Sequence, residues 1–311
     1  MENKITDKKV EKYYKNTYLI ISTIGLYFLI LILKPIFYNL FDFSLKNMNE
    51  IYSKLINITY QIFAITMSIN FFIKNKKSTL KQFLGYLKTC RIGALTIIVY
   101  SLTSILELAV LYYANVDVKA MTVISKTIYL ISFEVLIMAI IALINHESLE
   151  KELKDIKKNH KKYYKENFKY YLFALGVMMI SNLIINMIQP GIAGNEENVR
   201  NTLNYAPVYM FTTAVLFAPF TEEMVFRKSI RNIIKDDLTF IITSGLVFGG
   251  LHVVGNITTF ADVLYIIPYS APGIAFAYML VKTKNIFVPM GIHFMHNGIM
   301  MSLQILLLLL T

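Results

Sequence analysis

Nine long apolar stretches divide this chain, and a water-soluble domain has no way to bury them all. Each is close to the roughly 20 helical residues that cross a bilayer core about 30 Å thick. The stretches are 17–38, 55–73, 92–114, 120–144, 170–189, 205–226, 238–255, 261–281 and 286–310. Of the 311 residues, 56% are hydrophobic and 16% are charged, against about 25% charged in soluble domains. The sequence therefore predicts an all-α, polytopic transmembrane helix bundle with about nine spans.

Basic residues mark alternate connections between these stretches and give the bundle an orientation. They gather before the first stretch, in 74–91, 145–169 and 227–237, and in the short turn at Lys282 and Lys284. Because Lys and Arg accumulate on the cytoplasmic side of membrane proteins, we expect the N-terminus inside and the C-terminus outside. The net charge of +11 then reflects membrane topology. The bilayer is the expected surrounding, and nucleic acid is not an expected partner.

The chain changes character near Met187. Six of its seven prolines, most of its glycines and three of its five histidines lie beyond that residue. Pro and Gly inside spans are tolerated where neighbouring helices or cavities satisfy the freed backbone groups. We therefore expect 1–169 to be a four-span scaffold with lysine-rich cytoplasmic loops and 170–311 to be a five-span catalytic core. The Lys/Asn/Ile-rich, Trp-free composition indicates a bacterial source, hence a multi-pass protein of the cytoplasmic membrane.

Ionisable residues at membrane depth are costly and are treated as functional candidates. In the first half, Glu107 and Lys126 lie equally far on either side of the turn near Asp117. A helical hairpin would bring them to one depth, so we interpret them as a structural ion pair. Glu134 lies two turns beyond Lys126 and has no assigned role.

The second half contains a denser set of polar residues, beginning on the sixth stretch. Glu222 and Glu223 follow Pro219, and Arg227 lies four residues after Glu223. Residues four apart share a helix face, so Glu223 and Arg227 are expected to pair. Glu222 points about 100° away and is available for other chemistry.

Two further stretches carry histidines at comparable depth. His252 lies one turn after Phe248, and His293 and Asn297 are one turn apart on one face of the last stretch. With a rise of 1.5 Å per residue, Glu222 and His252 are each about 21 Å from the turn that joins their helices. Three helices thus place Glu222, His252, His293 and Asn297 at overlapping depth, which predicts a common polar site. His296 lies off that face and is expected to be structural or supporting.

At these residues the chain resembles the CAAX-protease and bacteriocin-processing family of intramembrane endopeptidases, which includes the Rce1-like prenyl-protein proteases. The family pattern is Glu-Glu-x-x-x-Arg, Phe-x-x-x-His and His-x-x-x-Asn, each on its own span. The matching residues are Glu222, Glu223, Phe226, Arg227, Phe248, His252, His293 and Asn297. The resemblance covers roughly 180–311 and leaves the first four or five spans unexplained.

The resemblance implies an enzyme that hydrolyses a peptide bond in a membrane-associated peptide or protein. It assigns Glu222 as the general base acting on water, with His252 helping to hold that water. His293 and Asn297 would donate hydrogen bonds to the oxyanion. The Glu223–Arg227 pair, supported by Phe248, would keep Glu222 aimed.

The cofactor is left open by the sequence. Glu222, His252 and His293 are candidate ligands for a catalytic zinc ion with an open position, and the family is often described as metalloprotease. However, no His-Glu-x-x-His helix is present, and the same residues suffice for a metal-free mechanism, which we favour. The single Cys90 excludes a cysteine-based metal cage.

Two other functions fit the same residues. The first is a non-catalytic bacteriocin-immunity or peptide-binding membrane protein. The second is a proton-coupled transporter with a Glu/His relay, against which stand the lack of a visible internal repeat and the single polar cluster. The residues do not select between a prenylated tail, a leader peptide and a pheromone precursor as substrate.

Overall fold

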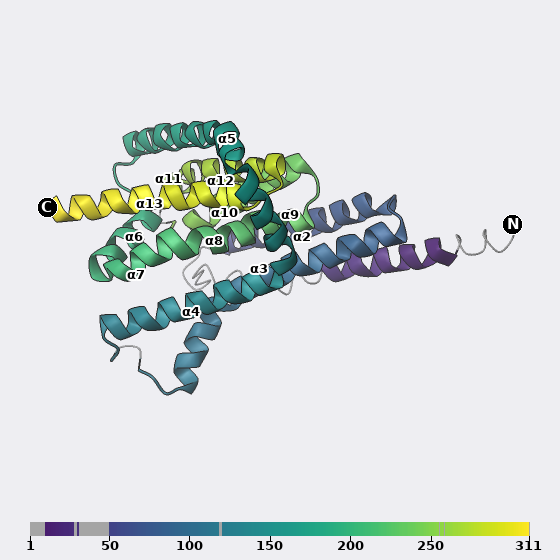
Figure 1. Ribbon diagram of the computed structural model, residues 1–311, viewed down its shortest axis with the longest axis horizontal. Coiled ribbons are helices and arrows are strands. Elements are labelled where there is room, and N and C mark those ends of the chain that lie inside the picture. Colours follow the sequence, from purple (N-terminus) through teal and green to yellow (C-terminus); the bar gives the residue numbers. More distant parts are fainter. Residues whose placement is uncertain are drawn as a thin grey trace. The chain divides into compact units, whose positions relative to one another are not determined.

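The computed structural model describes residues 10–27, 30, 50–117, 120–254, 256–257 and 259–310, and the regular structure in them is helical (Figure 1). Residues 10–27 form the first helical segment. The elements that follow are α2 (Glu50–Lys76), α3 (Leu80–Tyr113), α4 (Val123–Ile144), α5 (His146–Ile188), α6 (Gly194–Tyr205), α7 (Pro207–Thr212), the π-helix η1 (Thr213–Phe217), α8 (Ala218–Glu222), the π-helix η2 (Glu223–Ser229), α9 (Ile230–Ile233), α10 (Asp237–Val254), α11 (Phe260–Leu264), α12 (Ile266–Thr283) and α13 (Phe287–Leu310).

Five helices of the described chain are long and apolar enough to cross a membrane. They are Leu80–Thr103, Val123–Ile144, His146–Ile188, Ala261–Thr283 and Phe287–Leu310. These correspond to the third, fourth, fifth, eighth and ninth expected stretches, so an all-α, multi-pass membrane protein is confirmed. The first expected stretch lies partly outside the described residues. The total of nine spans and the inside-to-outside orientation stay predictions.

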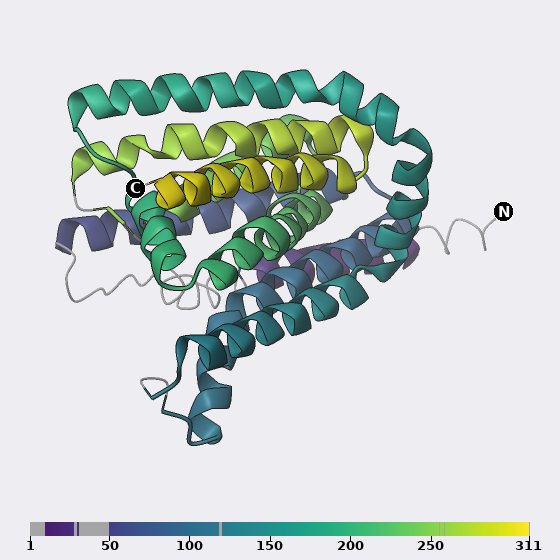
Figure 2. The same cartoon turned by 60° about the vertical axis from the view of Figure 1, so that its left-hand side comes forward.

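Two of the expected lysine-rich connections are helical. Helix α3 already begins at Leu80 and α5 at His146, so much of 74–91 and nearly all of 145–169 extend the helices that follow them. Lys and Glu are good helix formers, and a polar helix is stable in water beyond the bilayer. Figure 2 shows how α5 changes direction along its 43 residues.

Contacts group the chain into two compact units, Met1–Arg91 and Ile92–Thr311. In the first unit, Leu19, Phe71 and Phe83 form a small buried core, with the two phenylalanine rings edge to face at 6.1 Å. The second unit contains every candidate site residue. The functional boundary expected at residue 169 stays a prediction.

Within the second unit, α12 packs against α10 on one side and α5 on the other (Figure 1). Glycines bring α10 and α12 into backbone contact. A Cβ atom on Gly249 would lie 2.7 Å from the backbone nitrogen of Ser270, and one on Gly245 would lie 2.9 Å from that of Ile274. Such Gly-x-x-x-Gly spacing is typical of closely packed membrane helices. Gly249, three residues before His252, is thus a point of close approach between the two helices.

The sixth expected stretch is a continuous run of short α and π segments, from α7 to α9. Pro207 begins it at a first-turn position, where a missing N–H is tolerated. Pro219 follows η1 and has no N–H to donate to the carbonyl of Val215, so regular α-helical bonding is interrupted there. In η2, the hydroxyl of Ser229 donates to the carbonyl of Met224, five residues earlier. Pi segments of this kind often occur at functional sites.

A polar network at the other end of this run ties α5 to α13 and η2. The Glu152 carboxylate accepts hydrogen bonds from Lys228 Nζ and, at 2.7 Å, from the backbone nitrogen of Ile286. Asn285 Nδ2 donates to the Glu152 carbonyl and to Asp155 Oδ2, both at 2.8 Å. Because α13 begins two residues after Asn285, this network fixes the start of the helix that carries His293.

We predict that Gly249→Ala destabilises the protein while Gly250→Ala does not. Both changes favour helix formation equally. The added methyl group at residue 249 would collide with Ser270, whereas at residue 250 it would meet only Ile266 Cδ1, at 3.9 Å. We expect Gly249→Ala to lower the free energy of unfolding by about 1–3 kcal/mol, measured by denaturant titration in detergent micelles. Equal stability of the two variants would contradict the close packing of α10 on α12.

We predict that Glu152→Ala lowers the free energy of unfolding by about 3 kcal/mol, because it leaves the largely buried Lys228 ammonium without its carboxylate. The matched control is Glu150→Ala, two residues earlier on α5. Its partner Lys154 is exposed, and an ion pair in water adds little to stability, so the loss should be much smaller than that of Glu152→Ala. The same titration measures both, and equal losses would show that the network does not hold α5 to α13.

Candidate active site

Three of the expected polar residues lie close together between α13 and the run of short α and π segments from α7 to α9. Glu222 ends α8, Glu223 begins η2, and His293 lies two turns into α13. His293 Nδ1 is 3.0 Å from Glu223 Oε1, a hydrogen bond, and His293 Nε2 is 3.7 Å from Glu222 Oε2. The histidine thus lies between two adjacent carboxylates. Because a carboxylate only accepts, the Nδ1 nitrogen must carry the proton.

The two carboxylates differ in their surroundings. The Glu223 side chain is fully buried, whereas 17% of the Glu222 side chain is exposed. Glu223 is already engaged by His293 and by Arg227, whose Nε lies 3.3 Å from Glu223 Oε2. The expected Glu223–Arg227 pair is therefore present. Glu222 is therefore the more accessible of the two carboxylates.

Arg227 is fully buried and lies between aromatic rings. Its guanidinium carbon is 4.4 Å from the ring centre of Phe248 and 5.6 Å from that of Phe276. Within the described residues its nitrogens have no partner with hydrogen-bond geometry, so the charge is stabilised by Glu223 and by cation–π contacts. Phe276 also contacts the His293 ring, at 5.2 Å.

His252 reaches this cluster through Phe248. The Phe248 ring is 4.5 Å from the His252 ring and 6.0 Å from the His293 ring. His252 Nδ1 lies 2.8 Å from the Phe248 carbonyl, and because a carbonyl only accepts, this nitrogen is the donor. The neutral ring then presents Nε2 as an acceptor. Tyr269 stacks on the other side of His252, with ring centres 5.0 Å apart.

The Asn297 side chain is hydrogen-bonded to the backbone of η1. Its Nδ2 donates to the carbonyl of Ala214 at 2.8 Å. Ala214 lies in η1, and the hydroxyl of its neighbour Thr213 lies 3.0 and 3.1 Å from the two carboxylate oxygens of Glu134. Glu134, which the sequence left unassigned, thus holds α4 against η1. Asn297 is the only expected catalytic residue whose side chain already bonds a backbone carbonyl of another element in the described structure.

The structure also places the other polar residues that the sequence singled out, namely Glu107, Lys126 and His296. The Tyr129 hydroxyl donates to the carbonyl of Glu107 at 2.8 Å, so α3 and α4 do form the expected hairpin. Glu107 and Lys126 are within electrostatic range but make no direct salt bridge in the described chain. His296 Nδ1 lies 3.1 Å from the Tyr171 hydroxyl on α5, in agreement with a structural role.

Three contributors to the site were not foreseen: Tyr269, Phe276 and the carbonyl of Ala214. Aromatic residues are frequent in all apolar stretches, so Tyr269 and Phe276 gave no distinguishing signal. The amino-acid sequence does not show which backbone carbonyl a π segment leaves available for a hydrogen bond. The hydrogen bond from His293 to Glu223 also depends on this local backbone geometry.

The candidate zinc ligands do not converge as a metal site. Among the described residues, no three His, Cys, Asp or Glu side chains are arranged to hold a metal ion. His252 Nδ1 is directed to a backbone carbonyl and its ring is stacked on Tyr269, while His293 Nδ1 is bonded to Glu223. Those bonds leave Nε2 of each ring as an acceptor, as in metal-ligating histidines, so it is the placement of Glu222, His252 and His293, and not their chemistry, that does not fit zinc in this arrangement.

Comparison with known proteins agrees with the geometry of this site. Residues 204–299 match the sequence profile of the type II CAAX prenyl endopeptidase Rce1-like family. The chain is 28% identical over 234 residues to the membrane-embedded CAAX protease MroQ of Staphylococcus aureus, covering 68% of this chain and 88% of that protein. It is 25% identical over 143 residues to the putative membrane peptidase YdiL of Bacillus subtilis, covering 40% of this chain and 55% of that protein. No solved structure matches the chain.

The matched region contains the carboxylates, the arginine and both histidines that the fold brings to one place. Its limits, residues 204 and 299, enclose the run from α7 to α9, all of α10 and α12, and the first half of α13. The two relatives are bacterial and are named a protease and a peptidase. The chain is thus a multi-pass membrane protein, and the part of it that carries the candidate site is similar to the Rce1-like family of CAAX prenyl endopeptidases.

Proposed function

We propose that this enzyme hydrolyses a peptide bond in a membrane-associated peptide or protein, with Glu222 as the general base. The observation that carries the proposal is the unequal state of two adjacent carboxylates. Glu223 is buried and bound to Arg227 and His293, whereas Glu222 is partly exposed next to His293. A hydrolase needs one carboxylate held in place and one that can exchange protons with water.

In this mechanism Glu222 removes a proton from a water molecule as its oxygen attacks the carbonyl carbon of the peptide bond. His252 Nε2 accepts a hydrogen bond from the same water and orients it. The carbonyl oxygen becomes an oxyanion in the tetrahedral intermediate. Glu222 then returns its proton to the amide nitrogen and the C–N bond breaks, which gives a carboxylic acid and an amine; transfer of the acid proton to the amine leaves a carboxylate and an ammonium group.

His293 and Asn297 are proposed to stabilise the oxyanion. An Asn side chain has two N–H donors, and the contact with Ala214 uses one of them. The second can therefore serve the substrate while the first holds η1 in position. His293 would donate through Nε2 when its ring already carries a proton on both nitrogens, with Glu223 fixing the ring. No step uses a metal ion.

We predict that Glu222→Gln abolishes hydrolysis but keeps the fold, whereas Glu223→Gln destabilises the fold. Loss of a general base lowers kcat by about 10²- to 10⁴-fold. Loss of the Glu223 charge leaves the buried Arg227 unpaired, which lowers the free energy of unfolding by about 3–5 kcal/mol. Peptide cleavage in proteoliposomes and denaturant titration measure the two effects.

Glu222→Gln, together with His252→Ala, also tests the competing functions. An immunity or peptide-binding protein would keep its protective effect after Glu222→Gln. A transporter would show proton-coupled uptake that fails in His252→Ala without any peptide cleavage. Full cleavage activity in a folded Glu222→Gln variant would refute the proposed role of Glu222.

We predict that Asn297→Ala lowers kcat by about 10²- to 10³-fold, the usual effect of removing one oxyanion donor, with little change in KM. The matched control is His296→Phe, one residue earlier on α13, where an aromatic ring against Tyr171 is kept. Its kcat should stay within a few-fold of the wild type. A change in KM alone for Asn297→Ala would assign the residue to substrate binding instead.

A further inference from the structure

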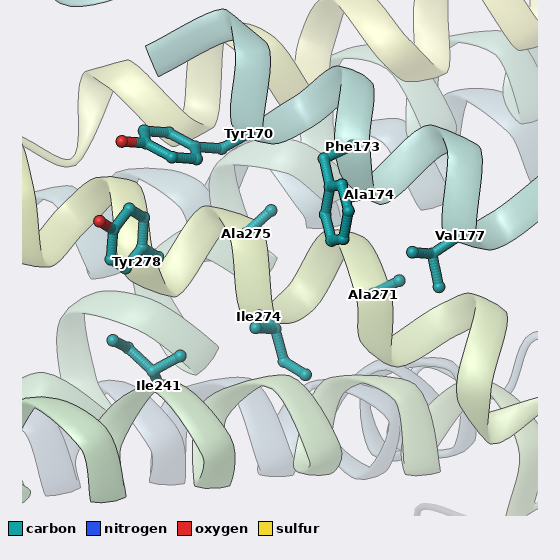
Figure 3. A pocket seen from close by; sticks show the side chains of 9 residues that line it. All are labelled: Tyr170, Phe173, Ala174, Val177, Ile241, Ala271, Ile274, Ala275 and Tyr278. Carbon is teal, nitrogen blue, oxygen red and sulfur yellow. The ribbon is translucent and has the colours of Figure 1, made fainter. Parts of the chain in front are cut away.

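An apolar groove of about 390 Å³ lies between α5, α10 and α12, and none of its lining residues belongs to the candidate active site (Figure 3). Its walls are aliphatic and aromatic side chains, and Tyr170 and Tyr278 are its only residues with polar side-chain atoms. Phe173, on α5, is 76% exposed and Ile274, on α12, is 38% exposed, so the groove opens outward. In a helix bundle within a bilayer, such an opening faces lipid.

A groove with such apolar walls is expected to hold an apolar ligand. Water does not fill apolar cavities, because it finds no hydrogen-bond partners there. Side chains that line an empty space lose dispersion contacts on that side. A second apolar groove of about 420 Å³ shares Val177 with the first and continues along α5 towards Ile188. The combined shape is long and narrow, as an acyl chain is.

One end of the groove is polar and basic. Tyr170 and Tyr278 are in edge contact there, with ring centres 4.8 Å apart, and both hydroxyl groups point to that end (Figure 3). Lys282 Nζ lies 5.6 and 5.5 Å from the two ring centres and 3.4 Å from the Tyr170 hydroxyl. Lys169 Nζ lies 5.2 Å from the Tyr170 ring.

These lysines have no carboxylate partner that would neutralise them. Within the described chain, no carboxylate lies within salt-bridge distance of Lys169 or Lys282. Tyrosine side chains are enriched at membrane–water interfaces, and basic pockets between membrane helices bind anionic headgroups. The lysine distribution assigns this end to the cytoplasm. The charge therefore complements a phosphate group at the membrane surface.

The two grooves together are long enough for an acyl chain. From Tyr170 to Ile188 the helix rises about 27 Å, which is most of a hydrocarbon core about 30 Å thick. We propose that this groove binds an anionic phospholipid, with one acyl chain along α5 and α12 and its phosphate group at Lys169 and Lys282. The lipid would pack against Ala275 of α12, the neighbour of Phe276 in the sequence.

The test is lipid retention by the full-length protein, extracted from nanodiscs that contain equal amounts of phosphatidylglycerol and phosphatidylcholine with identical acyl chains. Native mass spectrometry counts the bound lipids. We expect an excess of phosphatidylglycerol on the wild type. In the double variant Lys169→Gln, Lys282→Gln this preference should fall about fivefold for each lysine removed. Neither lysine belongs to the proposed catalytic machinery.

The matched control is Lys157→Gln, Lys161→Gln, which removes the same charge from exposed positions of α5. It should keep the preference. Equal retention of both lipids by the wild type, or an equal loss of preference in the control, would overturn the proposal.

A second variant tests the apolar part of the site. Ala271→Phe places a ring in the groove and should reduce retention of both lipids. Unchanged retention by the folded variant, judged by size-exclusion chromatography, would show that the acyl chain lies elsewhere. If this variant does not fold, the lysine variants still decide the question.

Discussion

A fully buried arginine is the constraint on which the rest of the site depends. Removing one partner of a buried ion pair is strongly destabilising, so Arg227 requires Glu223 in η2 and the aromatic rings of Phe248 and Phe276 around it. Those rings come from α10 and α12, and Glu223 in turn holds His293 of α13. One charge thus links four elements. Glu222, the residue before Glu223, takes its position from this arrangement.

The sequence predicted the main architecture because its signals are large. Long apolar stretches indicate membrane helices, and the residue spacing correctly predicted the Glu223–Arg227 pair and placed His252 one turn from Phe248. The extension of α3 and α5 into the lysine-rich segments was missed, because charge indicates which residues are in water but not whether they are helical. Interhelical distances, such as those between His293 and the two carboxylates, depend on packing that periodicity alone does not give.

Glycine and proline shape the active site from a distance. Gly245 and Gly249 let α10 approach α12 closely, which brings Phe248 and His252 towards Tyr269 and Phe276. Pro219 interrupts the regular helical hydrogen bonding of the segment from α7 to α9, three residues before Glu222. The polar network at Glu152 fixes the start of α13 and contacts Lys228, one residue after Arg227. The proposed catalytic residues therefore lie between two fixed contacts, the close packing of α10 on α12 and the Glu152 network. These contacts hold the helices that carry the residues.

The π segments also change how this part of the chain has to be aligned. A π-turn closes with a bond from residue i to i+5 instead of i+4, so each such turn accommodates one additional residue. A helical wheel drawn with 3.6 residues per turn loses its rotational phase after Thr213. Comparisons with relatives therefore need to allow single-residue gaps within 213–217 and 223–229, or they will assign side chains before and after these segments to the wrong faces of the helix.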